Sequence, residues 1–157
     1  MSQEKFDCIV VGAGPSGLTA AYILAKAGLQ VIVIERGEFP GAKNVMGGVF
    51  YRYPLDQVIP EFWKTAPIER VVVEQRMWLL SDQAGIKIGA ADQRLVDPPN
   101  NFTVLRAKFD RWLADQVTNA GAMIITDTVV EDVIKKDGKI VGVKTGREEG
   151  DLYADCI

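Results

Sequence analysis

Histidine is absent from this chain of 157 residues, and cysteine is rare, with two residues. The lack of histidine excludes, within the chain, a histidine acid or base and a metal site built on histidine. Cys8 and Cys156 cannot supply the four thiolates that hold an iron–sulfur cluster. Neither belongs to a Cys-x-x-Cys pair and both lie in apolar, strand-like runs, so we expect two buried, reduced thiols.

Long hydrophobic runs and clusters of basic residues are also missing. No stretch approaches the roughly 18 consecutive apolar residues of a membrane-spanning helix. The net charge is −3 and lysine and arginine are scattered, which argues against nucleic-acid binding. The first residues lead directly into a strand and contain no signal peptide, so we predict a cytoplasmic protein. Peripheral contact with the inner face of a membrane is still compatible with this sequence.

What is present near the start is a strand, a helix and a second strand. The composition, 48% hydrophobic and 25% charged, is that of an ordinary globular protein. Apolar runs predict strands over residues 6–11 and 30–34, and the intervening pattern predicts a helix over 15–27 that ends at Gly28. Together these form one βαβ unit with parallel strands.

A glycine-rich turn connects the first strand to this helix, with the pattern Gly12-x-Gly14-x-x-Gly17. The first glycine allows a tight turn, the second lets the backbone approach a pyrophosphate, and the third lets the helix pack close to the strand. The helix N-terminus then offers N–H groups and a partial positive charge to phosphate. The residues expected at the phosphates are Gly12, Ala13, Gly14, Pro15, Ser16 and Gly17.

An acidic residue, Glu35, ends the second strand, 18 residues after Gly17. This spacing suits a carboxylate that accepts hydrogen bonds from an adenosine ribose, and it argues against a 2′-phosphate. The alternative is a solvated acid at the end of a strand. The motif by itself does not distinguish FAD from NAD.

The rest of the chain predicts further strands and one amphipathic helix. Residues 36–54 are rich in glycine and without period, which predicts a long loop. A short helix interrupted at Pro60 follows, and then strands around a turn at 82–85. Within these strands, residues 77–80 are expected in the core.

The C-terminal third predicts a strand, a helix and a strand over residues 102–126. In the helix, Phe109, Leu113 and Val117 recur at a spacing of four and indicate one buried face. Asp137-Gly138 predicts a β-hairpin turn, and a last strand begins near residue 151.

Several segments together resemble a known family. They are "ERGEFPGAKNVMGGVFY", "APIERVVVEQRMW", "VLRAKFDRWLADQVTNAGA" and "DGKIVGVKTG". They resemble the electron-transfer-flavoprotein:quinone oxidoreductase family in its nitrogen-fixation (Fix) branch, near the geranylgeranyl reductases and aromatic hydroxylases. The resemblance covers essentially the whole chain, and these segments are more specific than the glycine turn.

The resemblance implies an α/β fold, a Rossmann-like FAD-binding domain of the glutathione-reductase-like type, with a parallel sheet and an added β-hairpin or meander. Residues 1–157 would be the N-terminal part of an FAD/NAD(P)-binding domain, in which the 50–101 region begins an inserted second subdomain. Family members are longer and carry a second FAD motif with an Asp-Gly pair. Because this chain stops at "YADCI", we expect an incomplete fragment whose substrate site lies beyond residue 157.

The resemblance also implies a set of FAD contacts. The glycine turn would hold the pyrophosphate, Glu35 would bind the adenosine ribose, and Arg36 would lie beside the nucleotide. Further contacts would come from Lys43, Asn44, Gly47, Gly48, Arg106 and Val129. The first four of these would line the loop that approaches the flavin, the arginine would contact FAD from the far side, and the valine would reach the adenine through its backbone.

The chemistry of these residues leaves simpler alternatives for three of them. A pair of adjacent glycines would let backbone N–H groups lie close to a planar ring, or would only make the loop flexible. The guanidinium of Arg106 could bind phosphate through two N–H groups, or could form a surface ion pair. Lys43 could contact the cofactor, or could be a solvated cation.

The implied function is an FAD-dependent oxidoreductase that passes electrons from electron-transfer flavoprotein toward quinone. Neither a catalytic nucleophile nor a metal site is expected in the chain. A separate ferredoxin-like subunit would supply the iron–sulfur relay, because the chain lacks the cysteines for one. The alternatives are a geranylgeranyl-reductase-like enzyme that reduces isoprenoid double bonds, an NAD-binding Rossmann module, and a non-catalytic truncated fragment.

Overall fold

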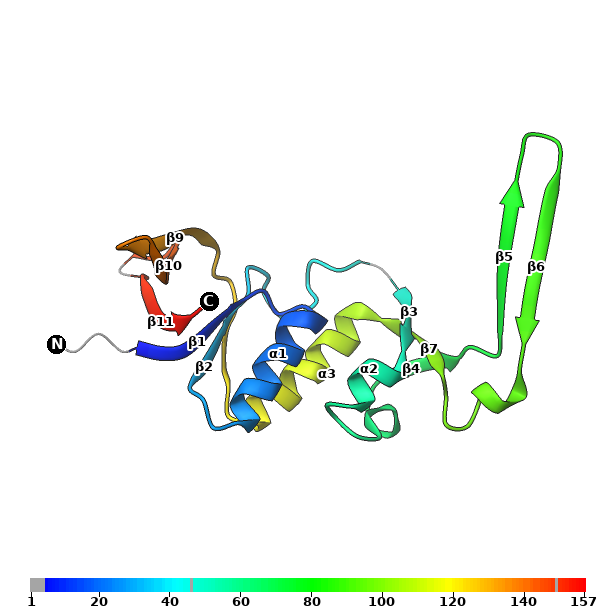
Figure 1. Cartoon of the computed structure of the whole chain (residues 1–157), viewed down its shortest axis with the longest axis horizontal. Coiled ribbons are helices and arrows are strands. Elements are labelled where there is room, and N and C mark those ends of the chain that lie inside the picture. Colours follow the sequence, from blue (N-terminus) through cyan, green and yellow to red (C-terminus); the bar gives the residue numbers. More distant parts are fainter. Residues whose placement is uncertain (1–4, 46, 149) are drawn as a thin grey trace. The chain divides into compact units, whose positions relative to one another are not determined.

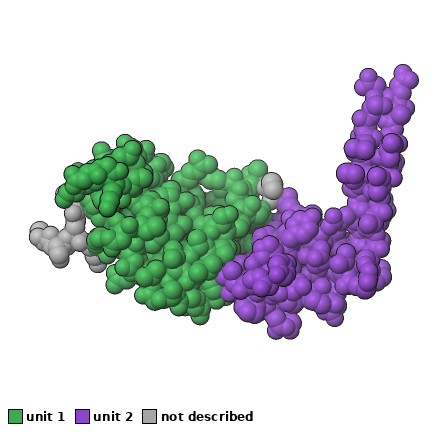
Figure 2. Space-filling view, in the orientation of Figure 1, with its two compact units in different colours: residues 1–46, 106–157 green, residues 47–105 purple. Residues whose placement is uncertain are grey.

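The structure is a computed structural model that describes residues 5–45, 47–148 and 150–157. The chain divides into two compact units, which Figure 2 distinguishes by colour. The first unit comprises residues 1–46 and 106–157, and the second comprises residues 47–105.

A mainly parallel sheet forms the centre of the first unit. Its strand order is β8-β2-β1-β11-β10-β9. The bounds are Met123–Ile125 for β8, Val31–Ile34 for β2, Lys5–Val11 for β1, Leu152–Cys156 for β11, Lys139–Thr145 for β10 and Val130–Lys136 for β9. The first four strands run parallel and the last two form an antiparallel hairpin. The predicted α/β fold, with a parallel sheet and an added hairpin, is confirmed.

Two helices pack side by side in this unit, α1 (Pro15–Lys26) and α3 (Arg106–Asn119) (Figure 1). The apolar face predicted for α3 is buried, since Phe109, Leu113 and Val117 have no exposed surface. Strand β2 reads Val-Ile-Val-Ile and is buried along its whole length, as expected for a parallel strand covered on both faces. The apolar patterns in the sequence therefore predict the positions of β1, α1 and β2 along the chain.

The β9–β10 hairpin turns at the predicted dipeptide. Asp137 has φ 51° and Gly138 has φ 77°. Two successive residues with positive φ are what a two-residue turn needs to match the right-handed twist of its strands. Asparagine, aspartate and glycine tolerate this conformation best, which is why the dipeptide predicts the turn.

The second unit consists of two small antiparallel sheets and short helical segments. In chain order these are β3 (Gly47–Tyr51), α2 (Arg52–Asp56), η1 (Phe62–Lys64), β4 (Ile68–Val71), β5 (Glu74–Leu80), β6 (Gly85–Ala91), η2 (Gln93–Leu95) and β7 (Asn101–Leu105). One sheet has the order β3-β7-β4, and the other is the β5–β6 ribbon. The loop predicted over residues 36–54 is wrong from residue 47 onward, because β3 pairs with β7 along its whole length. Such long-range pairing outweighs the weak strand propensity of glycine.

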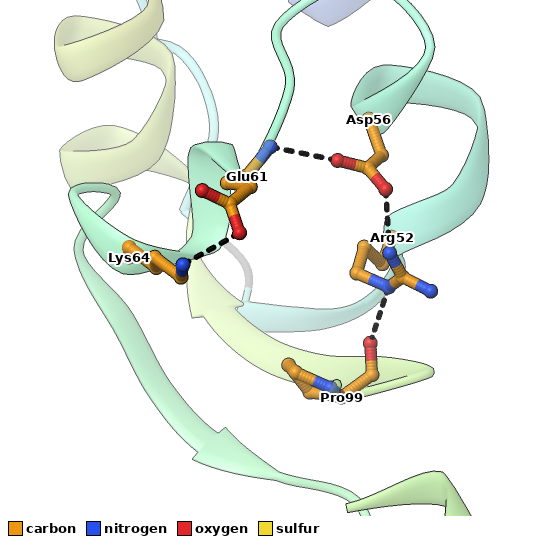
Figure 3. A network of polar contacts seen from close by, with 5 residues as sticks. All are labelled: Arg52, Asp56, Glu61, Lys64 and Pro99. Atoms are coloured by element: carbon orange, nitrogen blue, oxygen red, sulfur yellow. Dashed lines mark hydrogen bonds and ion pairs between the residues drawn. The ribbon is translucent and has the colours of Figure 1, made fainter. Parts of the chain in front are cut away.

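An aromatic cluster and a polar network hold the non-ribbon part of this unit together. The rings of Phe50 and Phe102 stack at 5.9 Å between centroids, and the edge of Phe62 contacts both. Figure 3 shows the polar network, in which Arg52 donates to the carbonyl of Pro99 and pairs with Asp56, with Glu61 and Lys64 beside them. Arg52 thus fastens α2 to the segment that precedes β7, and the N–H of Glu61 donates to Asp56 and connects the start of η1 to α2.

The β5–β6 ribbon is exposed along its whole length. Residues 77–80, predicted to lie in the core, are 51–71% exposed, so that prediction is wrong. The apolar pattern signals a strand correctly, but the ribbon has no described layer packed on it. The prediction of two buried thiols is confirmed for Cys8 and wrong for Cys156, and both are free thiols. Among the described residues, no helix is long and apolar enough to cross a membrane.

Candidate cofactor site

The three glycines of the turn differ in what the fold requires of them. Gly12 has φ 101°, a conformation that residues with a side chain rarely adopt. A Cβ on Gly17 would lie 2.1 Å from the carbonyl oxygen of Gly12, so this glycine lets the helix approach the strand. A Cβ on Gly14 would meet nothing within 4 Å, and its φ of −81° suits any residue. The fold itself therefore gives no reason for glycine at position 14, whereas a ligand close to the backbone would.

The helix that follows the turn presents unpaired amide groups. Gly14 is the N-cap residue and has no side chain to cap the helix, and its carbonyl accepts the first helical hydrogen bond, from Leu18, at 2.9 Å. Pro15 has no N–H, so the amides of Ser16 and Gly17 are left without a helical acceptor. Together with the helix dipole, such amides form an anion site. The turn thus has the shape and charge to take a pyrophosphate.

Glu35 is tied directly to the turn, a role that the sequence reasoning missed. Its Oε2 accepts from the N–H of Ala13 at 2.8 Å, and its Oε1 accepts from the N–H of Gly37 at 2.7 Å. Gly12 also donates its N–H to the carbonyl of Ile34 at 2.8 Å. The carboxylate therefore fixes the turn against the end of β2. Each oxygen has a second lone pair, so the predicted acceptor role toward a ribose stays compatible with these bonds.

A segment far along the chain lies beside Glu35. The N–H of Glu35 donates to the carbonyl of Ile125 at 2.8 Å, and its carbonyl accepts from Thr128 at 3.0 Å. These bonds bring Val129, the predicted adenine contact, to the same edge of the sheet. The carbonyl of Val129 accepts from Gly146 at 3.0 Å, so part of its backbone is already used within the protein.

The loop after β2 is fastened to the start of α3. Asp110 accepts two hydrogen bonds from Arg106, from Nε and Nη2, each at 2.9 Å, and a third from Asn44 Nδ2 at 3.2 Å. The guanidinium of Arg111 lies 4.0 Å from the ring centroid of Phe39. The predicted side chains Arg106 and Asn44 are thus brought together by a carboxylate that the sequence reasoning did not single out. Its signal was the i, i+4 spacing of an arginine and an aspartate on the buried face of a helix.

The ion pair of Arg106 is not the surface pair that the sequence left as an alternative. Arg106 is about one-fifth exposed, and its partner Asp110 has no exposed surface. The hydrogen bonds that Arg106 donates to Asp110 are the main cause that raises the pKa of Arg106 above its ordinary value. Lys43 and Arg36 are exposed, as is Ser16 in the first turn of α1.

The pair Gly47–Gly48 lies in strand β3 and not in a loop, so the predicted loop over these two residues is wrong. They border a cavity of about 500 Å³ on the β3–β7–β4 sheet. The side chains that surround it are a mixture of apolar and polar groups, from Val49, Glu69, Arg70, Thr103, Val104 and Leu105. A cavity with two glycines on one wall suits a flat ligand, since no side chain projects from that wall.

Known proteins match this chain over nearly its whole length. The model of the FAD dependent oxidoreductase family matches residues 7–156. Protein FixC of Bradyrhizobium diazoefficiens is 40% identical over 159 residues, which cover 100% of this chain and 37% of that protein. Protein FixC of Rhizobium meliloti is 43% identical over 160 residues, with 100% and 37% covered. The chain therefore spans about 37% of the length of these relatives.

Solved structures agree on the fold. A geranylgeranyl bacteriochlorophyll reductase-like protein from Thermoplasma acidophilum matches with a TM-score of 0.78 and 28% identity, over 98% of this chain and 38% of that one. Aklavinone-11 hydroxylase, solved with FAD and aklavinone, matches with a TM-score of 0.70 and 20% identity, over 98% of this chain and 32% of that one. At this lower identity the match supports the fold alone.

Proposed function

The chain belongs to the family of FAD-dependent oxidoreductases, with FAD as its cofactor, and from this premise we propose that the intact protein carries electrons from electron-transfer flavoprotein toward a quinone. The proposal is supported by the Fix-branch segments of the sequence and by the similarity to proteins named FixC. A bound flavin supplies the redox chemistry in such a protein, while the chain binds the cofactor, orients it and tunes its potential.

The observation that supports the cofactor site most directly is the open space at Gly14. The residues around it would contact different parts of the cofactor. The amides of the first turn of α1 would hold the pyrophosphate, and Glu35 would hold both the turn and the adenosine ribose. Arg36 and Val129 would flank the adenosine. Lys43, Asn44 and Arg106 would contact the cofactor from the loop and from α3, and Gly47–Gly48 would lie near the flavin ring.

The partners follow from the resemblance to the Fix branch. By that resemblance, a separate ferredoxin-like subunit would relay electrons between flavin and quinone. Because quinones reside in membranes, the intact protein would work as a peripheral protein at the inner face of the membrane. The 50–101 region would begin an inserted second subdomain.

A second candidate is the reduction of isoprenoid double bonds. It is favoured by the structural match to a geranylgeranyl bacteriochlorophyll reductase-like protein, which has the higher TM-score of the two matches described above. Both candidates use the same cofactor site and differ in the molecule that accepts electrons from the flavin. Only the reductase would convert an isoprenoid substrate when a strong reductant is supplied.

The test uses the protein expressed from its complete reading frame. We expect a yellow protein whose absorbance is bleached by reduced electron-transfer flavoprotein and restored by a quinone analogue once the iron–sulfur subunit is added. Omission of that subunit is the control and should slow the return of the absorbance. Turnover of geranylgeranyl groups without electron-transfer flavoprotein would favour the second candidate, and a colourless protein that binds no flavin would contradict both.

A further inference from the structure

A buried carboxylate lies at the centre of the contacts between the loop and α3. Among the described residues, Asp110 is the only charged residue that is buried, and it has no exposed surface. Burying a carboxylate is costly unless charged or polar donors meet it. A leucine or alanine would fill a helix position facing the core without that cost. The choice of aspartate therefore calls for a reason beyond packing.

Asp110 orders two side chains that come from different parts of the chain. Its carboxylate receives Nε and Nη2 of Arg106 from the same helix and Nδ2 of Asn44 from the loop after β2. The two hydrogen bonds from the guanidinium form a fork, which fixes the plane of that group as well as its position. The fork uses two of the five N–H groups of the guanidinium, and the remaining three keep their capacity to donate.

The backbone keeps this arrangement compact. Gly41 has φ 91°, and a Cβ there would lie 3.0 Å from the carbonyl oxygen of Arg106 and 3.1 Å from Cβ of Asp110. The loop thus lies directly against the first turns of α3. The next residues of this loop include Asn44, whose amide reaches the carboxylate.

We propose that Asp110 is a positioning residue of the cofactor site, which orients the Arg106 guanidinium and the Asn44 amide so that both meet FAD in one fixed arrangement. The inference rests on the proposed function, in which these two side chains contact the cofactor. An arginine on the surface would lose much side-chain freedom when it binds a ligand. Here that freedom is already restricted in the folded protein, so the donors are organised before the cofactor arrives.

The first experiment replaces the carboxylate by its isosteric amide, Asp110→Asn, in the protein expressed from its complete reading frame. After removal of bound flavin, the dissociation constant for FAD is measured by the quenching of flavin fluorescence. We expect FAD affinity to fall about tenfold or more, the effect of losing one charge-assisted hydrogen bond. Asp115→Asn is the matched control, because Asp115 is exposed on the same helix, and its affinity should equal that of the wild type.

A mutant cycle distinguishes positioning from general stabilisation. If Asp110 acts through Arg106 and Asn44, Asp110→Asn should weaken FAD binding no further in a protein that already carries Arg106→Gln and Asn44→Ala. A further loss of affinity in that background would overturn the proposal, because it would mean that Asp110 acts independently of both side chains. Wild-type affinity in Asp110→Asn would overturn it as well. A wild-type protein that binds no FAD would instead refute the proposed function.

A second variant keeps the test valid if Asp110→Asn does not fold. Arg106→Lys retains a positive charge beside the buried carboxylate but cannot form the two-point fork. We expect this variant to fold with a melting temperature near that of the wild type and to bind FAD several times more weakly. Unchanged FAD affinity in a folded Arg106→Lys protein would show that orientation of the guanidinium has no part in binding.

Discussion

Replacing Gly14 by valine should abolish tight FAD binding and leave the fold intact. The structure separates the two effects at this position. The backbone of Gly14 has φ −81° and ψ 173°, an extended conformation that valine adopts readily. A Cβ placed there meets no protein atom within 4 Å. The folding cost is therefore limited to a poorer N-cap, about 1 kcal/mol or less.

The loss in binding follows from the amides that the valine would shield. The N–H groups of Ser16 and Gly17 lie in the first turn of α1, and a hydrogen bond to a charged group contributes about 1.5–3 kcal/mol. If the valine side chain keeps the pyrophosphate from two such donors, FAD binding weakens by about 3–6 kcal/mol. This corresponds to a roughly 10²- to 10⁴-fold rise in the dissociation constant.

The assay compares Gly14→Val with two variants of the same region by flavin content, by FAD titration of the flavin-free protein and by thermal melting. Ala20→Val adds valine to an exposed position of α1 and should change neither FAD binding nor the melting temperature much. Gly17→Ala should lower the melting temperature more than Gly14→Val does, since its Cβ would lie 2.1 Å from the carbonyl oxygen of Gly12. We expect that overlap to cost about 1–3 kcal/mol of stability. Normal flavin content in Gly14→Val would refute the assignment of the turn to the pyrophosphate.

Three further predictions concern the same unit. Acid precipitation of the intact protein should release free FAD into the supernatant, because the amides of the turn would hold the cofactor by hydrogen bonds and not by a covalent bond. Flavin that stays with the pellet would contradict this. Glu35→Gln should weaken FAD binding less than Glu35→Ala, since the amide keeps one oxygen that can accept from the N–H of Ala13 in the turn. Equal titration curves would contradict the anchoring role. Cys8→Ala should lower the free energy of unfolding by about 1–2 kcal/mol and leave the flavin content unchanged, because this residue is 6% exposed and lies in the core. Loss of flavin in this variant would show that Cys8 has another role.

The parallel sheet could be predicted from the sequence because local patterns and tertiary packing agree there. The apolar runs at β1 and β2, the glycine stop of α1 and the dipeptide of the β9–β10 turn each specify a local conformation that the fold also uses. When local conformational preference agrees with the packing of the whole fold, the structure of a segment can be predicted from its sequence. The same holds for the glycine turn, whose spacing encodes backbone geometry directly.

Strand β3 and the β5–β6 ribbon show where such reading fails. Gly47 and Gly48 have a low intrinsic preference for a strand, and the partner that makes them one, β7, lies more than 50 residues further along the chain. No local pattern encodes that pairing. In the ribbon, the apolar residues were correctly assigned to strands, but an apolar run shows only that the segment is suited to burial. Whether another layer covers that segment is a property of the whole fold.

Asp110 extends this argument from folds to sites. The family resemblance pointed to Arg106 as an FAD contact, and the chemistry of its guanidinium allowed either a bond to phosphate or a surface ion pair. The structure shows that two of its donors are already used by a buried carboxylate, which also reaches Asn44. In the proposed site, Asp110 would contact the side chains that bind the cofactor and not the cofactor itself, so looking for phosphate-binding side chains in the sequence does not find it. Its sequence signature is the mismatch of a charged residue on the buried face of an amphipathic helix, four residues after its partner. Such mismatches are worth tracing in any helix that begins beside a nucleotide site, because an unpaired buried charge would destabilise the fold and a paired one fixes its partner in place.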